Sequence, residues 1–251
     1  MSAKRKLAVR GTLMDESLYK EIKKLHIVLK ENREGQDYFV GDIHGKYTDL
    51  MERLRCLDFD FEKDRLVSVG DIINRGDESE KLLHLLSENW FFAVQGNHEH
   101  MFLNCLTDEK RRPFFYSVGG TWLKKWIDNP ESIKIFKNQI IDKMPMFITV
   151  ESKEGNIGVS HADAPKDWQS VIDKSLNEET LALCQWRRIG DVKPRKKINS
   201  VDACVHGHTA VKKVKCINNQ VWIDTYYLSN EMTILSAAQV MKKVKSKWFN
   251  F

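Results

Sequence analysis

Three times in residues 38–99, an apolar run ends at a glycine that charged or polar side chains follow. The segments are YFVGDIHG at 38–45, LVSVGDIINRG at 66–76 and WFFAVQGNHE at 90–99. Between them lie KYTDLMERLRCL and ESEKLLHLLSEN, in which leucines recur at helical spacing. This β-α-β-α-β order predicts a parallel sheet with helices on its faces, because parallel strands need a long crossover connection.

Two later segments repeat the pattern, with Ser160-His161-Ala162-Asp163 and His206-Gly207-His208-Thr209 after apolar runs. Ligand sites in open α/β sheets lie beyond the carboxyl ends of the strands. We therefore expect these clusters to meet at one edge, and five of the eight histidines of the chain lie within them. The segments 146–151, 156–162, 202–209, 220–225 and 232–240 are predicted to be short strands.

The residue types in these clusters suit a transition metal. Asp42 and His44 are two positions apart, so an extended backbone points both side chains to one side. Carboxylate and imidazole ligands together favour Mn, Fe or Zn over Ca or Mg. Asn97 is a neutral metal ligand of suitable type, and His98 beside it is free for proton chemistry.

Residues 1–36 are polar and charged, and we interpret them as an N-terminal extension that is partly helical. Within them Leu18, Ile22, Leu25 and Leu29 recur at helical spacing, which predicts a short amphipathic helix. Residues 37–251 are expected to form one catalytic domain.

The net charge of +5 is concentrated near the two ends of the chain and favours a solvated surface over a nucleic-acid interface. The five cysteines form no Cys-x-x-Cys pair, which is typical of reduced thiols in a cytosolic protein. The first residues lack the apolar segment of a signal peptide, and no apolar run reaches the roughly 18 residues of a membrane span. We expect a cytoplasmic protein with no membrane or nucleic-acid partner; the sequence does not indicate an oligomeric state.

The motifs Asp-x-His, Gly-Asp-x-x-x-Arg-Gly, Gly-Asn-His-Glu, His-Ala-Asp and Gly-His-Thr occur here in that order. Together they resemble the metal-dependent phosphoprotein phosphatases of the calcineurin-like metallophosphoesterases. FFAVQGNHE, SHADAP, VHGHTAV and VWIDT resemble the branch typified by the bacteriophage lambda protein phosphatase, and the resemblance spans roughly residues 37–240. It implies an α/β fold: a central β-sandwich of mixed strands flanked by helices, with a dimetal site at the strand ends.

The resemblance also implies two divalent metal ions, with Mn²⁺ expected and Fe, Zn or Ni as alternatives. By the same resemblance Asp71 bridges the two ions. The first ion is bound by Asp42 and His44, and the second by Asn97, His161 and His208.

His98 is then implied to be the general acid, and Arg75 to bind the substrate phosphate. A second arginine is expected from Trp186-Arg187-Arg188, where the family pattern favours Arg188 over Arg187. His206 departs from the family pattern and is expected to be structural.

The implied reaction is hydrolysis of phosphoserine and phosphothreonine in a protein or peptide, with phosphotyrosine as an additional substrate. A metal-bound hydroxide attacks phosphorus directly, and His98 protonates the leaving alkoxide. The alternative is a nucleotide or dinucleoside polyphosphate hydrolase with the same metals. For that alternative, Lys193, Arg195, Lys196 and Lys197 would steer polyphosphate, although a solvated loop is the simpler interpretation.

Two other functions fit less well. A binding module without activity would have eroded ligands, whereas all six expected positions are filled. The nucleases of the superfamily carry a further histidine where this chain has Ala210.

Two departures from the family pattern bear on activity. Asn74 stands where the family has the aspartate that orients the acid histidine. The Asn74 amide oxygen is expected to accept from the ring N–H of His98 without adding charge, which lowers the pKa of His98 and weakens or acid-shifts the activity. The second departure is Tyr226-Tyr227, two phenols that either line the substrate edge or pack inside.

Overall fold

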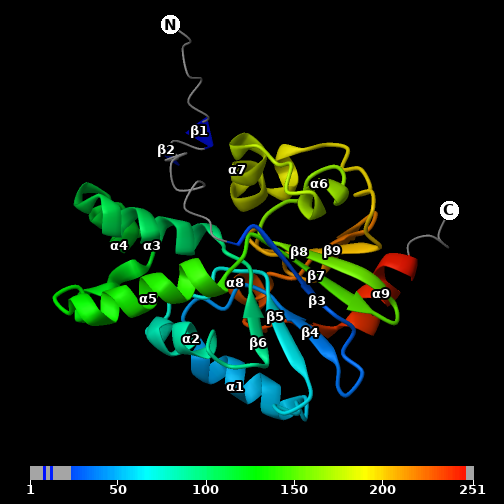
Figure 1. Cartoon of the computed structure of the whole chain (residues 1–251), viewed down its shortest axis with the longest axis horizontal. Coiled ribbons are helices and arrows are strands. Elements are labelled where there is room, and N and C mark those ends of the chain that lie inside the picture. The colour runs from blue at the N-terminus through cyan, green and yellow to red at the C-terminus, as the bar shows by residue number, and fades with distance from the viewer. Residues whose placement is uncertain (1–7, 10–11, 14–23, 247–251) are drawn as a thin grey trace, which may run out of the picture.

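The computed structural model describes residues 8–9, 12–13 and 24–246. In this part of the chain, two sheets pack face to face, and helices cover the outer face of each (Figure 1). This is the α/β sandwich that the resemblance implies, with mixed sheets and flanking helices.

The larger sheet has six strands, in the order β10-β11-β9-β8-β7-β3. Parallel pairing joins β3 to β7, β8 to β9 and β9 to β11, and antiparallel pairing joins β7 to β8 and β10 to β11. The strands are β3 His26–Leu29, β7 Phe147–Ser152, β8 Gly155–Ser160, β9 Ala203–His206, β10 Lys215–Ile217 and β11 Gln220–Trp222.

The smaller sheet has four strands, in the order β12-β4-β5-β6. Its three strands β4, β5 and β6 are parallel and alternate with helices α1 and α2, which confirms the predicted β-α-β-α-β unit. The strands are β4 Asp37–Val40, β5 Arg65–Ser68, β6 Phe91–Ala93 and the antiparallel β12 Ile234–Ser236. A separate two-stranded ribbon pairs β1 Ala8–Val9 with β2 Thr12–Leu13.

The helices fall into groups by the sheet that they cover (Figure 1). Covering the four-stranded sheet are α1 Tyr47–Cys56, α2 Ser79–Leu85, α3 Asn97–Thr107, α4 Arg112–Ser117 and α5 Pro130–Lys143, with the 3-10 turns η2 Glu109–Arg111 and η3 Gly120–Lys125. Near the six-stranded sheet are α6 Gln169–Ile172, α7 Glu178–Trp186 and the turn η4 Ile189–Asp191. The last helices are α8 Tyr226–Ser229 and α9 Ala237–Ser246.

The strands alternate their side chains between two cores, as the period of two requires. In β4, Phe39 faces the sandwich interior, whereas Val40 faces the helices. In β5, Val67 and Leu66 divide in the same way. Ile148 and Val159 of the larger sheet complete the sandwich interior, so the two sheets bury one shared apolar layer.

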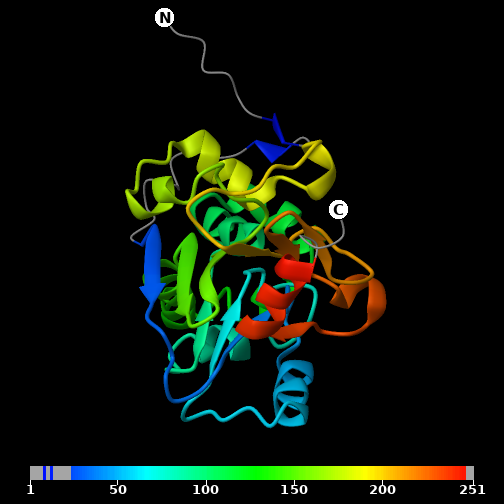
Figure 2. The same cartoon turned by 90° about the vertical axis from the view of Figure 1, so that its right-hand side faces the viewer.

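Helix α9 packs against strands of both sheets, β9 and β11 on one side and β4 and β12 on the other. Figure 2 shows this helix, in red, in front of the sandwich. Val240 and Val244 of α9 are buried in the sandwich core. The segment 232–240 was predicted to be one strand, and this is wrong from Ala237 onward, because the apolar side chains there follow helical spacing.

The helix predicted from Leu18, Ile22, Leu25 and Leu29 is wrong over its last turn. Residues His26–Leu29 form strand β3, which pairs with β7 at the edge of the six-stranded sheet. Strand pairing with β7 outweighs the helical spacing of these four leucine and isoleucine residues. Leu18 and Ile22 lie outside the described residues.

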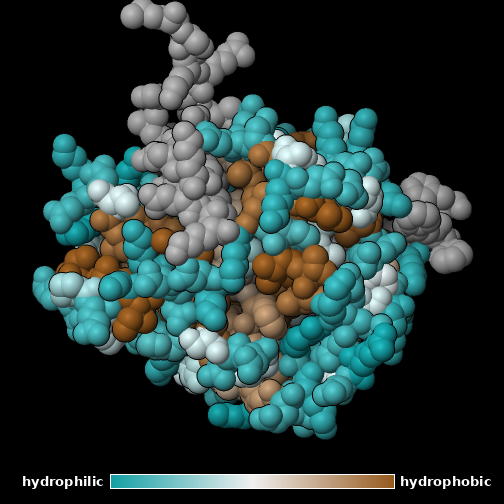
Figure 3. All heavy atoms as spheres, viewed as in Figure 1, coloured by the Kyte–Doolittle hydropathy of each residue, from teal (hydrophilic) through white to brown (hydrophobic). Residues whose placement is uncertain are grey.

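Apolar surface on the face in Figure 3 is broken into separate brown patches by hydrophilic side chains. This arrangement is ordinary for a folded domain and does not mark that face as an apolar docking surface. Of the helices described, none combines the length and apolar character needed to cross a bilayer.

Candidate active site

The loops after β4, β5 and β6 bring the first three sequence clusters together. Several residues in these loops and in the loop after β9 adopt left-handed backbone angles that side chains other than glycine rarely take. The φ values are 49° for His44, 51° for Asp71, 73° for Asn74, 66° for Arg75 and 61° for His208. Strained backbone of this kind concentrates at functional sites, where the surrounding structure holds it in place.

Two glycines allow two of these loops to touch. A Cβ atom on Gly45 would lie 2.5 Å from the carbonyl oxygen of Gly76, and one on Gly76 would lie 2.4 Å from that of Gly45. Any side chain at either position would push the loops apart. The close approach keeps His44 beside the loop that carries Asp71. The backbone N–H of His44 donates to the carbonyl oxygen of Asp71 at 2.9 Å.

Asp42, His44 and Asp71 form the first group of candidate metal ligands. His44 Nε2 lies 3.9 Å from an oxygen of Asp42 and 3.9 Å from an oxygen of Asp71. The Nδ1 atom of His44 lies 3.1 Å from the carbonyl oxygen of Ile73, so Nδ1 carries the proton and Nε2 presents a lone pair. Nε2 is buried and has no hydrogen-bond partner among the described residues, as expected of an atom that binds a cation.

Asn97, His161 and His208 form the second group, together with Asp71. Asn97 Oδ1 lies 2.8 Å from His161 Nε2 and 2.8 Å from His208 Nδ1. The far nitrogen of each ring faces a carbonyl oxygen, that of Val69 for His161 and that of Trp186 for His208, so the near nitrogens face the Asn97 oxygen. An amide oxygen and two ring nitrogens that converge in this way can hold a cation between them.

The charges of the buried carboxylates support the same conclusion. Burial, with the charges of Asp224 and Asp71, raises the pKa of Asp42 well above its usual range. Burial is the largest single influence on the pKa of His161 and lowers it. The charges of Asp71 and Asp42, together with hydrogen bonds to Asp71 and the Val69 carbonyl, outweigh burial and raise the pKa of His161 to about 10. A proton on His161 thus takes the position that a metal cation would fill, and the six residues fit a pair of divalent ions.

Glu99 has a role that sequence reasoning missed. Its carboxylate is fully buried and accepts from the backbone N–H groups of Gly96, Asp71, Ile72 and Ile73, at 2.8 to 3.3 Å. It therefore fixes the loop that carries Asp71. Its position three residues after Gly96, at the start of a helix, was the available signal.

His98 contacts Asn74 differently from the sequence expectation. The Asn74 amide nitrogen lies 2.8 Å from His98 Nδ1, and Asn74 Oδ1 accepts from Trp122 Nε1 at 2.7 Å. An indole N–H can only donate, so its contact identifies the amide oxygen. The expectation that this oxygen accepts from His98 is wrong, because Trp122 already occupies it.

As a result, the amide N–H of Asn74 donates to His98 Nδ1, and the proton of neutral His98 is on Nε2. Nε2 lies 3.9 Å from an oxygen of Asp71. Burial lowers the pKa of His98 to about 4, against the opposing effect of Asp71.

One pocket of about 690 Å³ unites the ligands with the phosphate-binding candidates. Arg75 and Arg188 both line it, together with Asp71, Asn97, His98 and His208. The backbone N–H of Arg75 donates to the carbonyl of Gly119 at 2.9 Å, and Arg188 Nη1 donates to the carbonyl of His208 at 3.5 Å. Arginine forks match the oxygens of a phosphate group, so both side chains suit an anionic substrate.

Arg187 does not line this pocket. It donates instead to Asp163 at 3.1 Å, and Arg195 donates to the other oxygen of Asp163 at 2.8 Å. Arg195 also donates to the backbone carbonyls of Ile189, at 3.2 Å, and Arg188, at 3.0 Å. Arg195 therefore holds the backbone beside the pocket arginine, and the interpretation of this residue as part of a solvated loop is wrong, since it is only 8% exposed.

The two tyrosines have different positions. Tyr226 donates its hydroxyl to Asp49 and packs against the helical core, whereas Tyr227 is 70% exposed and lines the pocket with its ring 5.8 Å from the Arg75 guanidinium. Of the two alternatives expected for this pair, lining the pocket applies to Tyr227 and packing inside applies to Tyr226. His206 lies outside both ligand groups, buried against Ser160 and Trp222.

These features define a phosphoesterase fold with two candidate metal positions, and comparison with known proteins agrees. Residues 38–212 match the family model described as calcineurin-like phosphoesterase. The chain belongs to this family.

Relatives in the family carry more than one activity in their names. The chain is 32% identical to "Serine/threonine-protein phosphatase 1" of Salmonella typhimurium, over 75% of this chain and 85% of that relative. It is 31% identical to a symmetrical bis(5'-nucleosyl)-tetraphosphatase of Haemophilus influenzae, over 59% of this chain and 51% of that relative. Among solved structures, a putative diadenosine tetraphosphatase shares the fold with a TM-score of 0.57 and 19% identity, covering 85% of this chain and 98% of that one.

Proposed function

We propose that this protein is a metal-dependent serine/threonine protein phosphatase that also acts on phosphotyrosine. The observation that carries the proposal is the single pocket in which Asp71, shared by both ligand groups, lies with His98, Arg75 and Arg188. The longer match to a protein phosphatase than to a tetraphosphatase supports a protein substrate.

The candidate ligands would hold two divalent ions, one at each group. Such ions, when bound, neutralise phosphate charge and lower the pKa of water to near neutrality. Mn²⁺ is the expected ion, because carboxylate, imidazole and amide ligands together suit it.

Arg75 and Arg188 bind the non-bridging oxygens of the phosphate and orient phosphorus in the pocket. The ring of Tyr227 stacks near the Arg75 guanidinium and limits the positions that this side chain can take. Arg195 donates to the backbone carbonyl of Arg188 and so holds the Arg188 backbone in position.

His98 donates from Nε2 to the leaving oxygen. A neutral imidazole gives up this proton reluctantly, and full protonation would place a proton on Nδ1 against the amide N–H of Asn74. Aryl phosphates need less help from an acid, because a phenolate leaves more readily than an alkoxide. We therefore expect the protein to favour phosphotyrosine and small aryl phosphates more than a relative with aspartate at this position does.

The test is a metal-titrated hydrolysis assay with a phosphoserine peptide, a phosphotyrosine peptide and diadenosine tetraphosphate in parallel. Each is measured with Mn²⁺ and with a chelator, in the wild type, Asp71→Asn and His98→Asn. Mn²⁺-dependent peptide turnover that both substitutions reduce by at least about a hundredfold is expected. Faster cleavage of the dinucleotide than of either peptide would overturn the protein-phosphatase proposal.

A dinucleoside polyphosphate hydrolase is the second candidate. Two exposed aromatic side chains favour it, Phe114 at 46% and Tyr227 at 70% exposure, because both line the pocket and offer surfaces for a nucleobase. Phe114→Ala separates the two functions, since loss of this stacking ring weakens dinucleotide binding and leaves a small phosphate monoester unaffected.

A further inference from the structure

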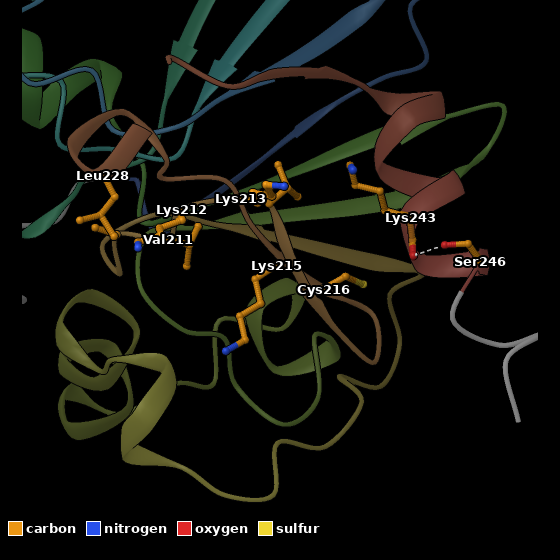
Figure 4. Close-up of a pocket in the computed structure, with 10 residues that line it drawn as sticks. Val211, Lys212, Lys213, Lys215, Cys216, Leu228, Lys243 and Ser246 are labelled. Atoms are coloured by element: carbon orange, nitrogen blue, oxygen red, sulfur yellow. Dashed lines mark hydrogen bonds between the residues drawn. The ribbon is translucent and has the colours of Figure 1, made fainter. Parts of the chain in front are cut away.

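A groove bordered by lysines lies beside the active-site pocket, and the proposed phosphoester hydrolysis does not use it. Its volume is about 550 Å³. Figure 4 shows its lining residues on three elements: the segment that runs into β10, the end of α8 and the last turns of α9. They are Ala210, Val211, Lys212, Lys213, Val214, Lys215, Cys216, Leu228, Lys243 and Ser246.

The lining is strongly cationic. Among residues 8–9, 12–13 and 24–246, the lining contains four lysines and no acidic residue. Lys212, Lys213 and Lys215 are exposed, and Lys243 is half-buried. Elsewhere on the surface, Lys30, Lys63 and Lys81 pair with carboxylates, whereas these four lysines form no ion pair within the part of the chain that the structure describes. Their charge is therefore available to an anionic partner.

The arrangement of the ammonium groups indicates the shape of that partner. In Figure 4 they point in different directions along the groove and do not converge on one spot. A single phosphate or other small anion would need converging donors, so an extended polyanion fits better.

The apolar residues of the groove decide between a peptide and a nucleic acid. Val211, Val214 and Leu228 lie among the lysines, and none of the described residues that line the groove is aromatic. Single-stranded nucleic acid is usually bound by basic grooves that also offer aromatic stacking surfaces. Alternating cationic and aliphatic surface suits an acidic peptide, whose carboxylates pair with lysine while its backbone and methylene groups lie on the aliphatic side chains.

The groove continues from the active-site pocket. Ala210 lines both, and Leu228 in the groove directly follows Tyr227 in the pocket. An extended chain advances at most about 3.6 Å per residue, so the segment from Ala210 to Lys215 spans no more than ~18 Å. A peptide anchored by its phosphate would therefore reach these lysines with residues roughly two to five positions away.

We propose that this groove binds acidic residues that flank the phosphorylated residue of a protein substrate. This inference rests on the proposed function and adds a sequence preference to it. The lysines are specificity-determining residues that act on binding and take no part in the chemistry.

The test compares two phosphoserine peptides that differ only in flanking residues, four glutamates in one and four glutamines in the other. The groove variant combines Lys212→Gln, Lys213→Gln, Lys215→Gln and Lys243→Gln. The matched control removes four lysines of η3 and α5, none of which lines the groove: Lys125→Gln, Lys134→Gln, Lys137→Gln and Lys143→Gln.

At low salt, the wild type and the control variant should hydrolyse the glutamate peptide with about tenfold higher kcat/KM than the glutamine peptide, as the sum of several weak exposed ion pairs. In the groove variant, the ratio should fall to near one. Hydrolysis of para-nitrophenyl phosphate should stay the same in all three proteins. A wild-type ratio near one, or the same ratio in the groove variant as in the control, would overturn the inference.

A binding measurement tests the groove independently of the proposed function, because it requires no hydrolysis. A fluorescent glutamate-rich peptide without phosphate is titrated into the wild type and the groove variant, and its anisotropy is followed. We expect binding that the four substitutions weaken about tenfold. Equal binding by both proteins, or preferential binding of a fluorescent oligonucleotide, would overturn the groove inference even where peptides are turned over. Failure to hydrolyse either phosphopeptide would instead overturn the proposed function.

Discussion

The indole N–H of Trp122 donates to the amide oxygen of Asn74 over 2.7 Å, and this contact orients the amide toward His98. The only group left to face His98 Nδ1 is the amide N–H, at 2.8 Å. A carboxylate at the same position could accept from both rings at once. Asn74 therefore presents a donor and not an acceptor to His98, and if His98 is the general acid that we propose, activity should depend on this position.

Asn74→Asp is predicted to raise kcat on phosphoserine peptides by about tenfold or more, and to have a smaller effect on para-nitrophenyl phosphate. A carboxylate accepts from Nδ1–H of His98 and raises the pKa of this side chain, so the acid form persists to higher pH. The limb of the pH–rate profile on which activity falls as pH rises should therefore move to higher pH. An unchanged profile with equal effects on both substrates would contradict the assigned orientation.

Trp122→Phe tests the same contact from the other side. Without the indole N–H, the Asn74 amide is free to turn its oxygen toward His98, so activity on phosphoserine peptides should rise with no change at residue 74. The lost hydrogen bond should lower the free energy of unfolding by about 1 kcal/mol. Urea unfolding and steady-state kinetics measure the two effects, and a decrease in activity would argue against this account.

Arg195→Gln is predicted to raise KM for phosphopeptides several-fold with little change in kcat, because Arg195 holds the backbone carbonyl of Arg188 at 3.0 Å. Arg187→Gln is the matched control, since Arg187 pairs with the same Asp163 and makes no described contact with Arg188. Thermal unfolding of both variants separates loss of stability from loss of substrate binding. Equal KM values in the two variants would contradict the proposal that Arg195 positions Arg188.

Glu99→Gln is predicted to weaken Mn²⁺ binding by about tenfold to a hundredfold, although Glu99 is not a ligand. The substitution replaces one acceptor oxygen of a carboxylate that holds four backbone N–H groups around Asp71. The stability of the metal-free protein should fall by roughly 1–3 kcal/mol. Calorimetric titration of Mn²⁺, with chemical unfolding of the metal-free protein, measures both.

The two ligand groups should be separable by metal stoichiometry. His208→Ala removes a ligand of the second group only, so the purified variant should bind one Mn²⁺ where the wild type binds two. Asp71→Asn weakens both groups, because Asp71 is shared. Elemental analysis after dialysis gives the ratios, and retention of two ions by His208→Ala would mean that this residue is not a ligand.

The sequence by itself determined the features that depend on local order. The alternation of apolar runs with leucine-spaced helices specified β4-α1-β5-α2-β6, because side-chain period and crossover length act within short segments. The resemblance of the motifs then indicated the sandwich and all six candidate ligands, which the structure brings together.

Only the tertiary structure decided the contacts between distant segments. Strand β3 forms because β7, more than a hundred residues later, offers it an edge. Trp122 orients an amide 48 positions earlier in the chain, and Arg195 reaches Asp163 across 32. Such contacts depend on where the folded chain places two side chains, and no local period or spacing encodes that placement.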